Sequence, residues 1–391
     1  MGWKSLFSGV ASLVQGTEGV RRFEQSLARH LGRRHVLSFS SGKAALVAIL
    51  RALHARNPQR DEVLIPAYTC YSVPSAIVRA GLRVRLCDLR PGTLDFDFTQ
   101  LERQLDNPRL LCVMPTHLYG LPADVQRLRR LIRDPEITVV EDAAQAMGGE
   151  AQGQPLGTLG DVGFFSLGRG KAFSTVEGGL AVTDDDQLAA TISARQGALP
   201  HYGGGGVAKL LGYALALNGL LHPRLFWLPR GLPFLKLGET LYDPDFPMRR
   251  LCAFQAGLAR HWQERLESLQ QIRRRHVTHW RQVLDNPLIP ASVKESPPLI
   301  RYPLLLDRAE SAAKLLRQSD RLGLGLGGAY PQAIGGIAAL AGQLCDDSCP
   351  VAEDVARRLV TLPVHGYLLP ADFDNISALL QQAGVPLRGS P

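Results

Sequence analysis

The sequence lacks the features that would place the chain across a membrane, in a disulfide framework or in the secretory pathway. None of its 391 residues belongs to an uninterrupted apolar run of about 18 residues, the length that a membrane-spanning helix needs. Only six cysteines occur, and Cys345 and Cys349 have no second pair or histidine cluster to complete a metal site. The N-terminal residues MGWKSLFSGVASLVQG lack the continuous apolar segment and cleavage site of a signal peptide, so a cytoplasmic protein is expected.

Aromatic residues interleaved with basic ones, a mark of many nucleic-acid-binding surfaces, are also missing. The chain is basic, with 44 Lys and Arg, 36 Asp and Glu, and a net charge of +8. Its basic residues follow helical spacing at Arg127, Arg129, Arg130 and Arg133, or cluster in a predicted turn at Arg273-Arg274-Arg275. We therefore expect no nucleic acid partner, and interpret the charge as a solvated surface or as a pocket for a phosphate-bearing substrate.

What is present is an ordinary globular composition with alternating strand and helix patterns. The chain is 45% hydrophobic and 20% charged, and its length suffices for two domains. Predicted strands cover residues 36–39, 62–66, 84–87, 110–114, 137–140, 162–166, 180–183, 299–306 and 360–363. Predicted helices cover residues 19–31, 46–53, 72–80, 123–133, 253–284, 351–359 and 372–383. This alternation is typical of an α/β fold with a mostly parallel sheet and helices on both faces.

Several polar side chains directly follow predicted strands. They are Tyr68, His117, Tyr119, Asp142 and Gln145. In parallel sheets the ligand binds at the carboxyl ends of the strands. We therefore expect these five residues to lie around a binding site at one edge of the sheet.

The stretch from Val139 to Gly179 carries the most informative pattern. An apolar strand over residues 137–140 is followed directly by Glu141 and Asp142, and Lys171 comes about 30 residues later in a glycine-rich loop. A pyridoxal phosphate (PLP) enzyme needs a carboxylate that keeps the pyridine nitrogen protonated and a lysine amine that forms a Schiff base. Gln145 could contact the ring hydroxyl. The plain alternatives are that Asp142 only caps a helical turn and that Lys171 is a surface lysine.

A second pattern predicts a phosphate site. The predicted strand 36–39 is followed by Ser40-Ser41-Gly42-Lys43-Ala44 and then by a helix. This geometry points backbone N–H groups at an anion, and the Lys43 ammonium would add a positive charge. Ser166, five residues before Lys171, could donate to the same phosphate. The plain alternative is an ordinary serine-capped helix start.

From about residue 16 to about residue 384, the sequence resembles the DegT/DnrJ/EryC1/StrS family of PLP-dependent aminotransferases. The resemblance rests on segments in the family's order, among them FEQSLARHLG, SFSSGKAAL, EVLIPAYT, MPTHLYGLPAD, VVEDAAQAMGGE, LGTLGDVGFFSLGRGK and CPVAEDVARRLVTLPVH. It implies the α/β fold of type I PLP-dependent transferases. In that fold we expect a large PLP-binding domain over residues 1–252, a small C-terminal α+β domain over residues 253–391, and a homodimer.

The resemblance also implies a reaction and residue roles. Most members move an amino group from an amino acid, often glutamate, to a keto-sugar linked to a nucleoside diphosphate, in polysaccharide or secondary-metabolite biosynthesis. Lys171 would be the Schiff-base lysine and proton shuttle, Asp142 the partner of the pyridine nitrogen, and Gln145 a neighbour of the ring hydroxyl. The phosphate would lie at Ser166 and at Gly42, Lys43 and Ala44. Substrate contacts are expected from Tyr71, His117, Tyr119, Arg169 and Tyr330.

The sequence departs from the family's pattern at four places. Lys43 replaces a usual threonine, Cys70 stands where a ring-stacking aromatic is common, and Gly168-Arg169-Gly170 replaces His-Pro-Thr. Asp245-Phe246-Pro247-Met248 stands where many members have Asn-Tyr-Arg-Met, whose asparagine reaches the partner subunit's phosphate. We therefore expect Tyr68 or Tyr71 to stack on the cofactor ring. An aspartate would repel a phosphate, so we expect either a shifted loop or compensation by Lys43 and Arg169.

Residues 203–238 form an apolar insertion that does not follow the family's pattern. Residues 207–221 are almost wholly apolar, but the segment is too short and too interrupted by Gly and Pro to span a bilayer. A helix that is apolar on all sides is either buried in protein or lies at a membrane interface. Two hypotheses stay open. The insertion packs on the domain or a dimer partner, or residues 207–235 contact a membrane or cover a site for an apolar or lipid-linked ketone.

Two other functions also stay open. Family members that dehydrate sugars have histidine in place of the lysine, so Lys171 favours transamination. A non-catalytic regulatory protein with the same fold is the alternative from a different class, because the phosphate-binding loops are altered. Uptake of PLP by the purified protein would separate an enzyme from such a regulator.

Overall fold

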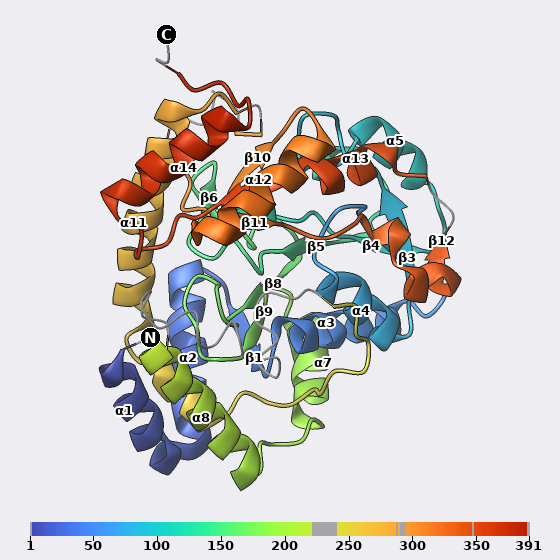
Figure 1. Cartoon of the computed structure of the whole chain (residues 1–391). Helices are drawn as coiled ribbons and strands as arrows, with labels where there is room; N and C mark the ends of the chain where they lie inside the picture. The colour runs from blue at the N-terminus through green and yellow to red at the C-terminus, as the bar shows by residue number, and fades with distance from the viewer. Residues whose placement is uncertain (1, 221–240, 287, 290–294, 346–347, 389–391) are drawn as a thin grey trace.

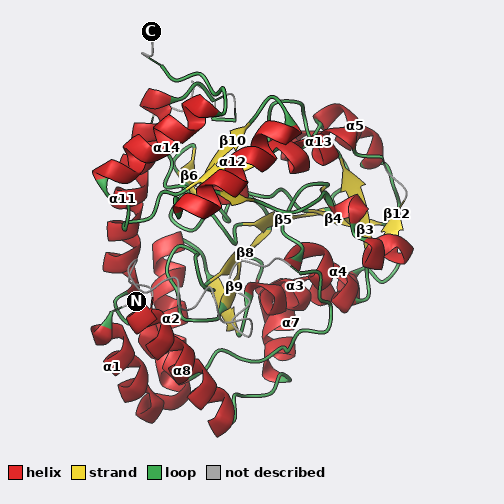
Figure 2. Cartoon of the chain, viewed as in Figure 1, coloured by secondary structure: helices red, strands yellow, loops and turns green. Residues whose placement is uncertain are grey.

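The computed structural model describes residues 2–220, 241–286, 288–289, 295–345 and 348–388. Its centre is an eight-stranded sheet in the order β1-β9-β8-β5-β4-β2-β3-β12 (Figures 1 and 2). The strands are β1 (His35–Phe39), β2 (Glu62–Pro66), β3 (Arg83–Cys87), β4 (Leu110–Val113), β5 (Thr138–Asp142), β8 (Val162–Ser166), β9 (Gly179–Thr183) and β12 (Leu344–Cys345). Only β9 pairs antiparallel with its neighbours, so the predicted mostly parallel sheet is confirmed.

Both faces of this sheet are buried. The bounds of the helices around it are α1 (Trp3–Ser12), α2 (Gly16–Leu31), α3 (Gly42–Arg56), α4 (Ser72–Ala80), α5 (Phe98–Gln104), α6 (Val125–Leu131), α7 (Asp186–Gly197), α8 (Gly204–Leu220) and α10 (Ala253–Leu258). Side chains alternate between faces along each strand. Phe164 therefore packs in the core that contains α3, and Phe165 packs with α2 on the other side.

The C-terminal part has a sheet and a core of its own. Strands β10 (Tyr302–Leu305), β13 (Leu359–Leu362) and β11 (Gly327–Gly328) form an antiparallel sheet. The helices of this part are α11 (Trp262–Val283), α12 (Ala309–Leu322), α13 (Pro350–Arg358) and α14 (Pro370–Gln382). A separate two-stranded hairpin consists of β6 (Glu150–Ala151) and β7 (Gln154–Pro155), which come between β5 and β8 in the chain. Trp280, Tyr302 and Ile376 are fully buried in this second core. β12 and α10 instead pack on the large sheet and its helices.

Several sequence predictions were wrong in detail. The single helix expected over residues 253–284 is two helices, because Ala259 leaves helical geometry and Arg265 donates to the carbonyl of Leu258 at the break. The Arg273-Arg274-Arg275 segment is no turn but lies within α11. Asp142 is the last residue of β5 rather than a loop residue. Helices α1, α5, α7 and α12 were not predicted.

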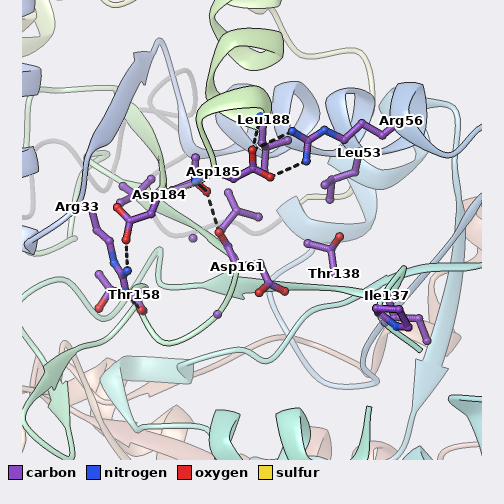
Figure 3. A pocket seen from close by; sticks show the side chains of 17 residues that line it. Arg33, Leu53, Arg56, Ile137, Thr138, Thr158, Asp161, Asp184, Asp185 and Leu188 are labelled. Carbon is purple, nitrogen blue, oxygen red and sulfur yellow. Dashed lines mark hydrogen bonds and ion pairs between the residues drawn. The ribbon is translucent and has the colours of Figure 1, made fainter. Parts of the chain in front are cut away.

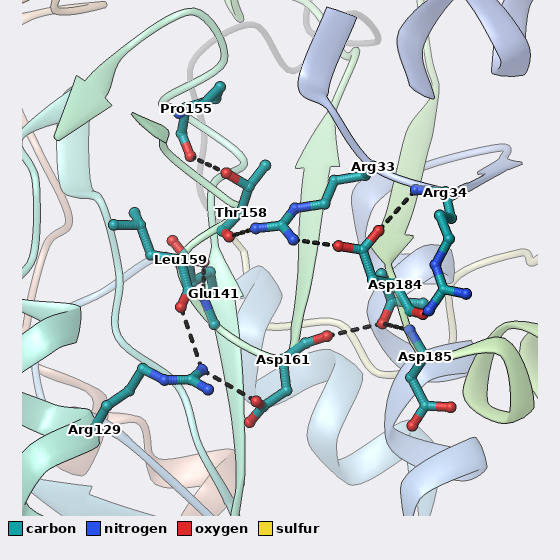
Figure 4. A network of polar contacts seen from close by, with 12 residues as sticks. Arg33, Arg34, Arg129, Glu141, Pro155, Thr158, Leu159, Asp161, Asp184 and Asp185 are labelled. Carbon is teal, nitrogen blue, oxygen red and sulfur yellow. Dashed lines mark hydrogen bonds and ion pairs between the residues drawn. The ribbon is translucent and has the colours of Figure 1, made fainter. Parts of the chain in front are cut away.

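Paired charges fasten the amino ends of the parallel strands (Figures 3 and 4). A cavity of about 430 Å³ opens there, at the edge of the sheet opposite Asp142. Asp184 bonds to Arg33 and to the backbone N–H of Arg34, and Asp185 accepts two hydrogen bonds from Arg56 at 2.7 and 3.0 Å. Hydrogen bonding to Arg56 lowers the pKa of Asp185 to about 2. These pairs tie α2, α3 and the start of α7 together, so we interpret the cluster as structural.

The apolar insertion begins as helix α8, and its residues 221–238 lie outside the described part of the chain. Leu210 and Ala214 of α8 are buried against Leu6 of α1 and Phe254 of α10. No helix within the described ranges combines the length and hydrophobicity required to cross a bilayer.

Candidate active site

Asp142 ends strand β5 at the carboxyl edge of the sheet. Only 4% of Asp142 is exposed, and the backbone N–H of Ala144 donates to its Oδ1 at 3.0 Å. Burial raises the pKa of Asp142, and the Ala144 N–H and the positive charge of Lys171 oppose that rise. Oδ2 has no hydrogen-bond donor among the residues that the structure describes. This oxygen is therefore able to accept a hydrogen bond from a protonated ligand nitrogen.

His117 and Glu141 form a second, fully buried pair behind Asp142. The backbone N–H of Ala123 donates to Nδ1 of His117 at 3.1 Å, so the ring proton of the neutral imidazole is on Nε2. Nε2 lies 2.7 Å from Oε2 of Glu141, which also accepts from the backbone N–H of Gly157 at 2.9 Å. Both ring nitrogens of His117 are thus engaged with protein groups.

Gln145 is fixed at both ends of its carboxamide. Oε1 accepts from the backbone N–H of Tyr119 at 3.0 Å, and Nε2 donates to the hydroxyl of Tyr330 at 2.8 Å. The Tyr330 N–H donates to the Tyr68 hydroxyl at 3.1 Å, and the rings of Tyr71 and Tyr330 stack with centroids 6.0 Å apart. Burial raises the pKa of Tyr68 to about 12. This buried tyrosine cluster joins the C-terminal part to the large sheet and orients Gln145.

The start of α3 comes close to the ends of β8 and β9. Ser41 caps the helix by accepting from the Ala44 N–H at 3.1 Å. A Cβ on Gly42 would lie 3.1 Å from Cβ of Ser166, and a Cβ on Gly179 would lie 2.3 Å from the carbonyl carbon of Ser41. Glycine is therefore needed at position 179, whereas a side chain at position 42 would require Ser166 to move slightly. The first N–H groups of a helix have no acceptor within it, so this end of α3, with Ser166 beside it, suits an anion.

Lys171 lies on the loop between β8 and β9. Side chains of helix α11 donate hydrogen bonds to backbone carbonyls of that loop. Arg273 donates to the carbonyl of Lys171 at 3.0 Å, and Arg265 donates to the carbonyl of Ser174 at 3.2 Å. Only 9% of Arg273 is exposed, and burial lowers its pKa to about 10. Gly170 has φ of 76°, which glycine tolerates. Two arginines of one helix therefore set the position of the lysine backbone.

Replacing Arg273 by methionine is expected to weaken cofactor binding by about tenfold, because a charged hydrogen bond to the loop is lost. The matched control is Arg274→Met, whose side chain is 38% exposed and pairs with Glu295. Titration of the purified apoproteins with PLP, followed by absorbance, measures the difference. Equal affinities in the two variants would contradict a positioning role for Arg273.

A cavity of about 450 Å³ brings together most of the predicted site residues. Its lining includes Gly42, Lys43, Cys70, Asp142, Gln145, Ser166, Arg169 and Lys171. These residues come from α3, the loops after β2 and β5, the end of β8 and the lysine loop. A cavity with a lysine, a buried carboxylate and a helix N-terminus on its walls has the groups that PLP would need.

Other predicted residues do not line this cavity. Ala44 is fully buried, and its N–H is taken by Ser41. Tyr68, Tyr71, Tyr119 and Tyr330 form the cluster behind Gln145, and His117 is engaged with Glu141. The geometry therefore gives no support to ring stacking by Tyr68 or Tyr71. Direct substrate contact by His117 has no support either.

Some residues with a place at the site were not predicted, among them Val176, Glu177 and Arg273. Val176 and Glu177 line the cavity, and Arg273 holds the lysine loop. Arg273 could have been found, because Leu266, Arg273 and Trp280 recur every seven residues on the buried face of α11. No sequence signal marks Val176, whose φ of 74° is unusual for a β-branched residue.

A family profile described as the DegT/DnrJ/EryC1/StrS aminotransferase family matches residues 9–218, more than half of the chain. The chain belongs to this family. The resemblance of the sequence motifs is thereby confirmed.

Curated relatives of this DegT/DnrJ/EryC1/StrS member include sugar aminotransferases. GDP-perosamine synthase from Caulobacter vibrioides is 34% identical over 175 residues, which is 45% of this chain and 46% of that protein. UDP-N-acetyl-3-dehydro-alpha-D-glucosamine 3-aminotransferase from Acidithiobacillus ferrooxidans is 34% identical over 179 residues, 46% of this chain and 47% of that protein. The matched part thus spans about half the length of these relatives.

Solved structures show the fold of this family member over nearly its whole length. PseC from Helicobacter pylori has a TM-score of 0.77 at 19% identity, covering 98% of this chain and 96% of that one. CalS13 from Micromonospora echinospora has a TM-score of 0.76 at 22% identity, covering 98% and 97%. The E. coli GDP-4-keto-6-deoxy-D-mannose-3-dehydratase has a TM-score of 0.73 at 17% identity, covering 97% of each chain. The expected fold class is confirmed.

Several departures from the DegT/DnrJ/EryC1/StrS pattern meet beside the cavity. Nζ of Lys43 lies 3.9 Å from Oδ2 of Asp243 and 4.1 Å from the centroid of the Phe246 ring. Burial lowers the pKa of Lys43, and the charge of Asp243 opposes that shift. The Asp245 side chain is 94% exposed and lies 3.6 Å from Arg79. Asp245 is thus paired with an arginine that does not line the cavity.

Proposed function

We propose that this protein is a PLP-dependent aminotransferase that moves an amino group from an amino acid, glutamate first among the candidates, to a nucleotide-linked keto-sugar. The observation that carries the proposal is the buried Asp142 carboxylate, with one oxygen unpaired, on the same cavity as Lys171. The acceptor class rests on the names of the relatives, which are synthases and aminotransferases of nucleotide sugars. We also propose a cytoplasmic homodimer, as the family resemblance implies.

The residues of the cavity fit PLP by their chemistry. Asp142 would accept a hydrogen bond from the pyridinium nitrogen, and Gln145 would lie near the ring hydroxyl. The backbone N–H groups at the start of α3, with Ser166, would hold the phosphate. When bound, PLP supplies an aldehyde carbon for an amine and a ring that stabilises negative charge on the adjacent carbon.

Lys171 and Asp142 have separate roles in the proposed reaction: Lys171 moves a proton, and Asp142 holds the pyridine ring. The Lys171 amine would take a proton from the α carbon of the donor and deliver it to the cofactor carbon that carried the aldehyde, two bonds away, so a single group would serve as base and then as acid. The Asp142 carboxylate keeps the ring nitrogen protonated throughout. Its burial strengthens that interaction, because the local dielectric is low.

Two basic side chains on the cavity support an anionic acceptor. Lys43 and Arg169 are lining residues, and Arg169 is largely exposed. A diphosphate-linked sugar carries negative charge, which such residues attract.

Because a dehydratase shares the fold, the fold alone does not decide between dehydration and transamination. Lys171 favours transamination, because dehydrating members of the family have histidine at this position.

The acceptor is tested by screening. The PLP-loaded protein is incubated with glutamate and a panel of nucleotide-linked keto-sugars and apolar ketones, and 2-oxoglutarate formation is measured. We expect acceptor-dependent turnover with a nucleotide-linked sugar. Turnover with apolar ketones only would overturn the acceptor class, and a protein that never takes up PLP would favour the regulatory alternative.

A further inference from the structure

Helix α1 exposes most of its large apolar side chains and buries Leu6 together with small residues. Trp3, Phe7, Val10 and Val14, from α1 and the turn after it, recur at helical spacing and are 58%, 70%, 45% and 94% exposed. The opposite face packs on α10, where a Cβ on Gly9 would lie 2.9 Å from the Phe254 ring. A surface helix of a globular protein normally has the reverse arrangement.

Helix α8 lies beside α1 (Figures 1 and 2). Leu6 of α1 shares a core cluster with Leu210 and Ala214 of α8, and Leu215 remains 43% exposed. Neither helix contains an acidic residue, whereas Lys4 and Lys209 are both exposed. The surface thus combines aromatic and aliphatic side chains with positive charge only.

We propose that this α1–α8 surface docks on an anionic lipid bilayer. Interfacial helices place Trp, Phe and aliphatic side chains at the boundary of headgroups and acyl chains, and their lysines contact anionic headgroups. Trp3 and Phe7 supply the aromatic anchors, and Lys4 supplies a neighbouring cation. The charge of the surface is complementary to an anionic bilayer, and no acidic residue of either helix opposes that attraction.

A second copy of the chain is a poorer fit for the same surface. A helix of ten residues is about 15 Å long. Helix α8, with 17 residues, adds about 25 Å. Even with faces about 10 Å wide, the joint footprint of the two helices is roughly 400 Å², well below the roughly 800 Å² per partner of a stable protein interface. Insertion into a bilayer needs only a few apolar side chains, so the small area is no obstacle there.

The docking surface adjoins the candidate active site. The Arg169 guanidinium, on the cavity, lies 5.6 Å from the centroid of the Tyr213 ring of α8. Val176 of the cavity wall shares the core cluster of Leu210 and Ala214. Docking would therefore hold the cavity near the lipid surface.

Vesicle sedimentation tests the docking without any catalysis. The full-length protein is mixed with phosphatidylcholine vesicles that contain either no anionic lipid or about 30% phosphatidylglycerol. We expect binding to the anionic vesicles, and about tenfold or more weaker binding for Phe7→Glu combined with Val14→Glu. Leu322→Glu is the matched control, because Leu322 is 65% exposed on α12, and it should bind as the unaltered chain does.

The outcomes separate docking from other roles of the surface. Circular dichroism melting shows whether the variants are folded, and light scattering gives their oligomeric state. Absence of vesicle binding by the unaltered chain overturns the proposal. The proposal is also overturned if Phe7→Glu abolishes the dimer and no lipid binding is observed. That result would assign the surface to a second copy. Because PLP uptake is measured separately, failure of the docking leaves the proposed transamination standing, and the reverse also holds.

Discussion

Replacing Lys171 by alanine is expected to abolish covalent attachment of the cofactor and to lower transamination by roughly 10²–10⁴-fold or more, because the same amine attaches PLP and moves the proton. Lys171 and Asp142 line one cavity. Among the described residues that line it, Lys43 has the only other amine that could replace the amine of Lys171. Absorbance in the visible range measures attachment, and glutamate-dependent formation of 2-oxoglutarate measures activity. Lys314→Ala, which alters an exposed lysine of α12, is the matched control.

Lys43 makes this experiment discriminating. It is a second lysine on the cavity, and its pKa is lowered by burial, which increases its nucleophilic fraction. Borohydride reduction followed by peptide mapping identifies which lysine carries the cofactor. Label on Lys171 is the expected result. Label on Lys43 in the unaltered protein, or a retained visible band in Lys171→Ala, would refute the assignment.

Replacing Asp142 by asparagine is expected to lower transamination on the order of 10²–10³-fold, the range seen when a preorganised electrostatic group is removed. Asparagine keeps the acceptor for the Ala144 N–H but loses the charge that holds the ring nitrogen protonated. PLP should still attach to Lys171. The visible band and the glutamate reaction are measured on the same sample, and full activity in Asp142→Asn would contradict the role.

Asp142→Asn is expected to lower activity but to raise the stability of the apoprotein. Burial raises the pKa of Asp142 in the folded state above its ordinary value of 3.8. Stability from this group is therefore fully present below pH 3.8 and is lost as the pH rises through the folded-state pKa. At pH 7 the apoprotein of Asp142→Asn should melt a few degrees above the unaltered apoprotein. Added PLP should raise the melting temperature of the unaltered protein more.

The strands and the site residues on them were predictable for a physical reason. Buried parallel strands are short apolar runs, so 62–66 and 162–166 could be located from the sequence, and both match the structure. Because carboxyl ends of parallel strands share one edge, Asp142 and Ser166 could be placed together before any coordinates. Their meeting on one cavity with Lys171 followed from the same rule.

What the sequence did not reveal depends on contacts between distant segments. The tyrosine cluster behind Gln145 requires Tyr330, 185 positions away, and nothing local to either residue indicates that bond. The spacing of Arg273 places it on the buried face of α11, but its hydrogen bond to the carbonyl of Lys171, 102 positions away, could not be predicted from the sequence. Helix α1 was missed although its apolar residues recur at helical spacing, and their outward direction depends on how α1 packs against α10.

The central claim is that the cavity of Lys171 and Asp142 carries an aminotransferase half-reaction, and it can be tested without knowing the acceptor. PLP-loaded protein is mixed with excess glutamate, and the visible band and the released 2-oxoglutarate are followed in a single turnover. The account predicts loss of the band together with about one 2-oxoglutarate per active site, and neither change in Lys171→Ala. An unchanged band with glutamate and with every other amino acid tried as donor would contradict it.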